Sequence, residues 1–535
     1  MTNCMNHLPV WRNWQTQQTQ NLPLATMCRF ESGHRHHEKT KEPRAIILVP
    51  FSVSVKAFPS GEGGARRATE RISKVDMNNT IGYVRRSENI SPTVGIIAEY
   101  NPFHNGHLYQ LTKIHEHFPD ATITVILSGS FTQRGEAAIL DKWTRATTAV
   151  KSGADLVLEL PYAFACRSAE HFARGGVQSL AALGIDTLAF GAESRDLVPL
   201  QAATACMDDP AFQSALHGRI ASGTSYAAAL SAELASRTSL DDTLLHAPNN
   251  ILAIEYLRAL TRYAPHVTPL LIPRIGAAYH DSALHGTYAS ASAIRNSISR
   301  PLNYQPPSPR EGDRVSGGRC GEGTTSLLPP PYSRRNIPWS TLQSVMPLSS
   351  YHALLHAATD IPSNDRLLRP LLARLLTLDG DALRAITGMN EGLEHRLLEK
   401  AQAAGSWDEL ISAISTSRYP QSRIARLLVH ILTNFTSDVA RSCDATGPRY
   451  LRVLAMNTAG AALLHRTKKT AHLPIITKTS RFLNRRDLLR PMDEWNPLQQ
   501  MLLFDIRATQ LRSLTLLAAS AAPLDLLTSP VYVKQ

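Results

Sequence analysis

One stretch, residues 94–108, constrains the fold more than any other part of this 535-residue chain. Residues 94–98 form a short apolar run, long enough for a buried strand and too short for most helices. Asn101 and Pro102 then signal a turn, because proline disfavours helix at the residue before it. Residues 108–118 are amphipathic, with their leucine, isoleucine and phenylalanine on one face. The stretch therefore predicts a strand, a tight turn and a helix.

Two histidines, His104 and His107, flank Gly106 at the predicted entrance of this helix. The first amides of a helix have no internal partner and carry the positive end of its dipole, so they attract phosphate. Gly106 lets a ligand approach the backbone closely, and residues three apart share one side of the first turn. A single histidine here would ordinarily cap the helix or fill the core, but the pair around a glycine favours a phosphate site.

Charge and cysteine spacing narrow the class of protein. The net charge of +12 and the pI of about 9.5 make a polyanion a plausible partner, although many basic proteins bind no nucleic acid. The six cysteines show no metal-ligand or redox spacing, which predicts reduced thiols in a cytoplasmic protein. No apolar run approaches transmembrane length, so no membrane association is expected.

Apolar runs alternate with helical patterns from residue 93 onward. The runs cover residues 94–98, 121–127, 154–160, 185–190 and 267–272, and the first helical patterns cover 108–118, 141–152 and 168–183. This alternation predicts an α/β fold, a doubly wound, Rossmann-like parallel sheet with helices on both faces. In such sheets ligands bind beyond the carboxyl ends of the strands, where the loops after these runs meet.

Several of these loops carry residues that suit a nucleotide. Arg134 and Lys142, after the second run, are expected to supply positive charge, with a solvated loop as the alternative. Gly191 would let the sheet edge touch a base or ribose, although it can equally be a turn glycine. Arg274 ends the fifth run, where it could meet phosphate bidentately or form an ordinary salt bridge.

Two helix starts follow later in the same segment. Asn249 and Asn250 precede a predicted helix at residues 251–260, where one can cap the helix and the other can point into the site. Ser290 and Ser292 open another helix, and Arg295 follows within its first turns, which is a second start suited to phosphate.

The chain divides by composition into five segments. Residues 1–92 lack regular periodicity and predict a disordered extension, and residues 303–336, rich in Pro, Gly and Ser, predict a flexible inserted linker. Between them, residues 93–302 hold the nucleotide-binding domain. Residues 337–490 predict a mainly α-helical, RNA-binding domain, in which Arg423 and Arg426 share one helix face and Tyr419 could stack on a base or pack in the core. Residues 491–535 predict a helical tail.

Longer strings around these motifs resemble one family. GIIAEYNPFHNGHL, SGSFTQRGEAAILDKWTRA, GADLVLELPYAFA, FGAES, PNNILAIEYLRAL, RIGAAYHD and SASAIR are similar to the bacterial tRNA(Met) cytidine acetate ligases, within the nucleotidyltransferase superfamily that carries a His-x-Gly-His signature. GMNEGLEHRLLEKA and RYLRVLAMNTAGAALL extend the resemblance, which covers residues 93–300 and 337–480. The extension and the linker have no counterpart in that family.

The resemblance implies a two-step ligase. ATP and acetate would give acetyl-adenylate and pyrophosphate, and the wobble cytidine of elongator tRNA(Met) would then take the acetyl group on its exocyclic amine. Magnesium is expected with ATP, without a dedicated protein site. His104 and His107 would stabilise the pentavalent phosphorus, and Ser290, Ser292 and Arg295 would hold pyrophosphate. The implied ATP contacts are Ile97, Ala98, Glu99, Tyr100, Asn101, Pro102, Phe103, His104, Asn105, Gly106, His107, Leu108, Tyr109, Gln110, Gly191, Asn249 and Arg274.

Two other functions remain open on the sequence alone. A small-molecule adenylyltransferase could use the same sheet on a phosphorylated precursor, but it would not need the long basic helical half. An RNA-binding protein without catalysis could keep the fold, but His104, Gly106, His107 and Arg295 are all intact. No protein partner is predicted.

Overall fold

The computed structural model describes residues 91–238, 247–275, 286–299, 337–390, 392–491 and 494–534. All of them belong to one compact unit that spans residues 85–535. The predicted extension at 1–92, except for its last two residues, and the predicted linker at 303–336 lie outside the described residues. Within the described ranges, every helix is too short or too polar to cross a membrane.

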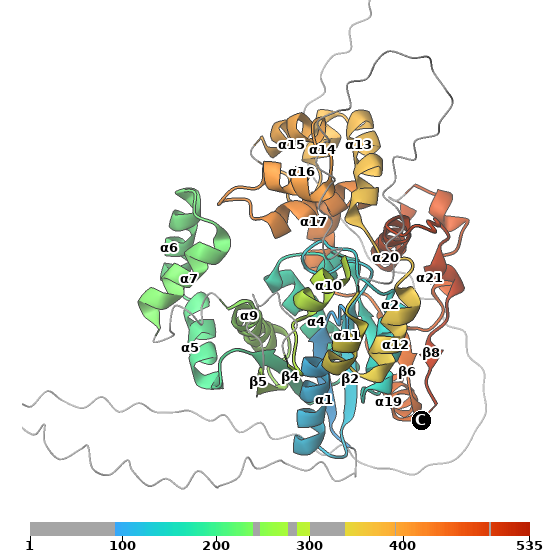
Figure 1. The fold of residues 1–535 in the computed structure, drawn as a ribbon. Helices are drawn as coiled ribbons and strands as arrows, with labels where there is room; N and C mark the ends of the chain where they lie inside the picture. The colour runs from blue at the N-terminus through green and yellow to red at the C-terminus, as the bar shows by residue number, and fades with distance from the viewer. Residues whose placement is uncertain are drawn as a thin grey trace, which may run out of the picture. The chain divides into compact units, whose positions relative to one another are not determined.

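A parallel sheet forms the centre of the fold (Figure 1). Its strands follow the order β5-β4-β1-β2-β3, and each neighbouring pair is parallel. The predicted parallel sheet is confirmed, since each strand lies within two residues of a predicted apolar run. The bounds are β1 Thr93–Ala98, β2 Thr122–Ser128, β3 Leu156–Leu160, β4 Thr187–Ala192 and β5 Thr268–Pro273.

Apolar side chains cover both faces of this sheet, because successive residues of a strand point to opposite sides. Val94 and Ile96 of β1 join a core cluster with Leu111 of α1, and Ile97 joins a second cluster with Leu180 of α4. The helices of this region are α1 Asn105–His117, α2 Lys142–Lys151, α3 Tyr162–Ala165, α4 Ala169–Leu183, α5 Leu197–Met207, α6 Pro210–Ala221, α7 Tyr226–Arg237, α9 Pro248–Tyr263 and α10 Ala291–Ser299.

The later part of the chain is largely helical, as predicted. Figure 1 shows α13–α17 as one group of helices in orange. The bounds are α11 Trp339–Val345, α12 Leu348–Ala357, α13 Leu368–Thr377, α14 Gly380–Arg384, α15 Leu393–Ala401, α16 Trp407–Ile414, α17 Gln421–Thr433, α18 Ser437–Thr446, α19 Thr458–Thr467, α20 Pro497–Leu514 and α21 Leu524–Leu527.

This later part also adds strands that sequence analysis did not predict. β6 Leu451–Met456 pairs antiparallel with β3, and β7 Ile475–Ile476 and β8 Val531–Tyr532 pair with β6. A six-residue apolar run is compatible with a strand or with a buried helix segment, so its pattern could not reveal β6. The sheet edge at β3 decides the matter, because it offers unpaired backbone groups that β6 satisfies.

The helical part packs directly on the sheet part. The Tyr162 hydroxyl lies 3.1 Å from Thr433 Oγ1, and His430 Nε2 lies 2.9 Å from the Cys166 carbonyl oxygen. Arg167 donates two hydrogen bonds to the Asp444 carboxylate, at 2.8 and 3.0 Å. These contacts bring α17 and α18 against the segments that follow β3.

Candidate active site

The two histidines cap the first turn of α1 through hydrogen bonds to backbone amides. His104 is the N-cap residue, and its Nδ1 accepts a hydrogen bond from the Gly106 amide at 3.1 Å. His107 Nδ1 accepts one from the His104 amide at 3.2 Å, which completes a capping box. The rings stack with centroids 3.8 Å apart. Because each Nδ1 accepts, the proton of each neutral ring resides on Nε2, and each ring keeps one donor for a ligand.

Burial keeps both rings neutral. His104 is only 5% exposed, and burial, with Arg274 and Arg295 nearby, lowers its pKa to about 3. Burial, the neighbouring His104 and Arg274 hold the pKa of His107 well below its usual value. Two stacked imidazolium ions would repel each other, so the neutral pair is the consistent state at neutral pH. The site therefore offers two N–H donors at the positive end of a helix dipole.

The backbone before the histidines adopts an uncommon conformation. Tyr100 has φ of +45°, a left-handed value that costs a bulky residue about 1–3 kcal/mol. Its ring packs at 4.7 Å from both Phe103 and His107, and the buried aromatic contacts offset this cost. This turn aims the end of β1 into the start of α1, as the sequence predicted.

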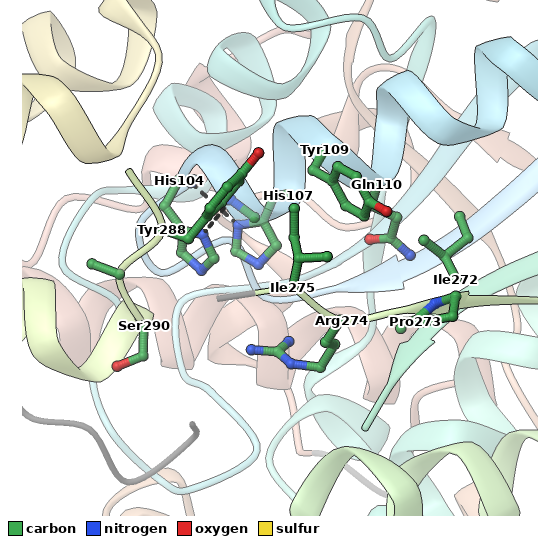
Figure 2. Close-up of a pocket in the computed structure, with 13 residues that line it drawn as sticks. His104, His107, Tyr109, Gln110, Ile272, Pro273, Arg274, Ile275, Tyr288 and Ser290 are labelled. Carbon is green, nitrogen blue, oxygen red and sulfur yellow. Dashed lines mark hydrogen bonds between the residues drawn. The ribbon is translucent and has the colours of Figure 1, made fainter. Parts of the chain in front are cut away.

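A pocket opens in front of the histidines (Figure 2). Arg274, from the end of β5, extends toward the histidine side of the pocket in Figure 2, and Gly191 of β4 lies beside it. A Cβ on Gly191 would meet Arg274 Cγ at 3.5 Å, an ordinary van der Waals contact, so Gly191 lies directly against the arginine stem. The lining residues are His104, Gly106, His107, Tyr109, Gln110, Gly191, Ile272, Pro273, Arg274, Ile275, Tyr288, Ala289 and Ser290.

Glu193 organises one side of this pocket, and sequence analysis did not single it out. Its carboxylate accepts from Asn249 Nδ2 at 2.5 Å and from the Asn250 amide at 3.1 Å, and it lies 3.8 Å from Arg274 Nε. Two expected ATP contacts are thus held by one carboxylate. Its place just after the fourth predicted strand could have indicated it, but a glutamate in a loop carries no distinctive signal.

Helix α9, whose first turn contacts Glu193, corrects one expectation. Asn249 and Asn250 lie inside the first turn of α9, whose N-cap is Ala247 without a side-chain cap, so neither asparagine caps the helix. Asn250 Oδ1 instead accepts from the Ser194 amide at 2.9 Å. The helix begins earlier than predicted because Pro248 occupies its first position, where a missing N–H costs nothing.

The second predicted phosphate site lies at α10. Ser290 Oγ accepts from the Ala293 amide at 3.0 Å and so caps the helix start. Arg295 donates to the Asn101 carbonyl at 2.9 Å and to Ser292 Oγ at 3.3 Å, and it pairs with Glu136 at 3.2 Å. Arg295 is therefore anchored to the segment that leads into the histidines.

The other residues of the predicted ATP stretch differ in where their side chains go. Tyr109 and Gln110 line the pocket, whereas Ile97, Tyr100 and Phe103 fill the core and Leu108 packs against it. The Asn101 side chain accepts from the Ile139 amide at 2.8 Å, and the Asn101–Pro102 bond is cis. Asn105 donates to the Thr287 and Ser344 carbonyls. Ala98 and Glu99 remain partly exposed at the end of β1.

Lys142 does not supply charge to the pocket, contrary to expectation. Its side chain is fully buried, and Nζ lies 2.6 Å from Glu159 Oε1 and 2.5 Å from Asp525 Oδ1. Arg452 also contacts both carboxylates. A buried ammonium needs such partners, because an unpaired charge in the core is very costly.

The described residues contain no group of three or more histidine, cysteine, aspartate or glutamate side chains arranged to hold a metal ion.

A parallel sheet with neutral stacked histidines at a helix start, and two arginines in reach, is the architecture of a nucleotidyltransferase site. The family model for the HIGH Nucleotidyl Transferase matches residues 92–523. The chain is 37% identical over 432 residues to the tRNA(Met) cytidine acetate ligase of Syntrophotalea carbinolica, covering 79% of this chain and 94% of that protein. It is 34% identical to the ligase of the same name from Syntrophomonas wolfei, covering 82% and 99%.

Solved structures agree with these relatives. The crystal structure of apo Thermotoga maritima TmcAL superposes with a TM-score of 0.69 at 27% identity, over 83% of this chain and all of that one. The structure of the same protein with alpha-thio ATP bound gives 0.68 at 26% identity, with coverage of 83% and 100%. The chain belongs to the tRNA(Met) cytidine acetate ligase family.

Proposed function

We propose that this protein activates acetate with ATP and transfers the acetyl group to the wobble cytidine of elongator tRNA(Met). In the first step an acetate oxygen attacks the α-phosphorus, and pyrophosphate leaves. In the second step the exocyclic amine of cytidine attacks the acyl carbon, and AMP leaves. The family and the ATP analogue bound to the Thermotoga maritima protein support this reaction.

The observation that carries the proposal is the pair of neutral histidines. His104 Nε2–H and His107 Nε2–H face the pocket side of the helix start as preorganised donors for the charge that develops on the α-phosphate. Such donors act without reorganising when the transition state forms, and one of them typically contributes about 10²–10³-fold in rate. Because the rings stay neutral, this stabilisation does not depend on a proton from solvent.

Arginines and hydroxyls complete the proposed nucleotide site. Arg274, oriented by Glu193, would neutralise the triphosphate from the β5 side. Ser290, Ser292 and Arg295 would hold the leaving pyrophosphate at the start of α10. Arg295 is ion-paired with Glu136 in this structure, so a phosphate that binds it would compete with that carboxylate. Magnesium would travel with the ATP phosphates, and no step depends on a protein-held metal.

The helical part would bind the tRNA. The net charge of +12 suits a polyanion, and Arg423 lies with its guanidinium 4.7 Å from the Tyr419 ring centroid near the start of α17. Arg426, one turn along α17, instead donates to the Gln133 carbonyl at 3.1 Å. Arg423 also donates to Asn390 Oδ1 at 3.0 Å, so a tRNA phosphate that binds Arg423 would compete with that amide.

Labelled acetate tests the proposal. With ATP and tRNA(Met), label should enter RNA as an acetylated cytidine, and AMP should form only when acetate is present. Pyrophosphate release that needs a small phosphorylated acceptor would favour an adenylyltransferase instead. His107→Ala should lose acetyl-adenylate formation while tRNA binding persists, and full ligation by that variant would contradict the catalytic assignment.

A further inference from the structure

One carboxylate in the segment that leads from β1 to His104 has a hydrogen-bond donor on only one of its two oxygens within the described residues. Glu99 follows β1, and its Oε1 accepts from the Gln133 amide at 2.7 Å. Among the described residues, no group donates to its Oε2. Glu99 is also the exception in the turn that leads to His104, because residues 100–104 are all buried whereas Glu99 is partly exposed.

The neighbouring carboxylates are already engaged. Glu136 pairs with Arg295 at 3.2 Å, and Glu193 accepts from Asn249 and the Asn250 amide. Of these three carboxylates, Glu99 is the one that makes no ion pair within the described residues.

A single loop residue joins Glu99 to the helical part. The Gln133 amide donates to Glu99, and the Gln133 carbonyl accepts from Arg426 of α17 at 3.1 Å. The loop lies tight against α17, since a Cβ on Gly135 would come within 2.6 Å of the Arg426 amide nitrogen. Glu99 therefore lies between the segment that leads to His104 and α17, the helix proposed above to contact tRNA.

We propose that Glu99 binds the exocyclic amine of the target cytidine and accepts the proton that this amine loses on acetylation. This role rests on the proposed ligase function and concerns its second step alone. A carboxylate is the side chain that accepts from cytosine N4 in nucleic-acid recognition. It is also a general base when it lies within hydrogen-bond reach of the proton.

The step balances without another reactant. The N4 lone pair attacks the acyl carbon of acetyl-adenylate, a nitrogen–carbon bond forms, and the bond from that carbon to the phosphate oxygen breaks. AMP leaves with the electron pair of the broken bond. One N4 proton passes to Glu99 Oε2 and from there to solvent, which the partial exposure of Glu99 permits.

The surroundings of Glu99 strengthen it as a base. Burial raises its pKa, and the Gln133 amide and Arg295 oppose that rise. The charged and titratable groups within electrostatic reach are Arg134, Glu136, Arg145, Cys166, Tyr256 and Arg295. Burial raises the pKa of Cys166 to about 12 and that of Tyr256 above its usual value, so both stay neutral. Glu136 is the other carboxylate of this set.

Glu99→Gln separates the two chemical steps. Hydroxylamine traps acetyl-adenylate as acetohydroxamate without needing an enzymic base, so acetohydroxamate formation from ATP and acetate measures the first step alone, including any part that Glu99 takes in binding ATP. In Glu99→Gln, single-turnover transfer to tRNA(Met) should fall by about 100-fold or more beyond any loss in acetohydroxamate formation. Glu116→Gln is the matched control, because Glu116 is half exposed near the end of α1 and, among the described residues, its ion pair is with Lys113. Both rates of this control should equal those of the wild type.

Each result decides the question. A wild-type rate of acetyl transfer by Glu99→Gln would overturn the proposal. Equal losses of transfer and of acetohydroxamate formation would also overturn it, because Glu99 would then act in adenylation or in folding. If wild-type protein forms acetohydroxamate but never labels tRNA, the proposed function fails instead. The acid limb of the transfer rate should disappear in Glu99→Gln and persist in Glu136→Gln, and its persistence in Glu99→Gln would also contradict the role.

Discussion

Gly106 offers the sharpest test of how the helix start works. A Cβ at this position would lie 2.9 Å from His104 Cε1, closer than real Cβ atoms approach, and 3.1 Å from His104 Nδ1, which is a tight contact. The His104 ring cannot simply swing away, because it is 5% exposed and stacks on His107. Gly106→Ala must therefore displace the ring and break its hydrogen bond to the Gly106 amide.

The expected costs can be worked out separately for stability and rate. The loss of the cap, about 1 kcal/mol, is offset by the gain in helix propensity from glycine to alanine, also about 1 kcal/mol. Overpacking then leaves a net destabilisation of about 1–3 kcal/mol. A misplaced donor at the α-phosphate should cost about 10²–10³-fold in adenylation. The variant should thus remain folded and nearly lose its first chemical step.

Acetate-dependent exchange of labelled pyrophosphate into ATP measures that step, and denaturant unfolding measures stability. Gly218→Ala in α6 is the control, since a Cβ there meets nothing within 4 Å. That control should be stabilised by about 0.5–1 kcal/mol with unchanged exchange. Wild-type exchange in Gly106→Ala would refute the view that His104 must hold its observed position.

Three further predictions follow from particular contacts. Glu193→Gln should release the Asn249 side chain and so raise the KM for ATP about 10-fold, with little change in kcat. An unchanged KM would show that Glu193 does not position Asn249 for ATP binding. The pKa of His104 is about 3 in the folded protein and 6.5 in the unfolded chain, so between pH 6.5 and 5 the unfolded chain binds more protons at this residue. The free energy of unfolding should therefore fall by about 2 kcal/mol over this range through His104. His104→Asn should lose that part of the acid sensitivity in denaturant titrations. Asp525→Asn should lower the free energy of unfolding by about 3–5 kcal/mol, because it removes a carboxylate that pairs with the buried Lys142 and Arg452. Asp381→Asn, which breaks an exposed ion pair, should cost under about 1 kcal/mol. Equal losses of stability for the two variants in chemical denaturation would contradict this distinction.

The local sequence pattern was sufficient to predict the strands of the sheet and the place of the two histidines at a helix start. Hydrophobic periodicity predicts each strand from β1 to β5, because a strand buried on both faces must be apolar along its length. His104, Gly106 and His107 could be assigned to a helix start because they follow a buried strand and a turn within a few residues. The geometry of this site depends on contacts between neighbours in sequence.

Contacts between residues far apart in the sequence could not be predicted from local patterns. Lys142 looked like a ligand for phosphate, yet Glu159 and Asp525, the latter far along the chain, enclose it in the core. Arg426 looked like a partner of RNA, yet the loop at Gln133 takes its hydrogen bond.

The sequence alone determined that this chain builds a parallel sheet and places two histidines at a helix start, since both follow from the order of residues along short segments. The tertiary structure decided which charges face the pocket and which neutralise each other in the core. It also decided that β6 extends the sheet and that Gln133 links Glu99 to Arg426 of α17. The physical reason is that burial and charge pairing are set by whichever distant segment packs nearest, and local sequence carries no record of that neighbour.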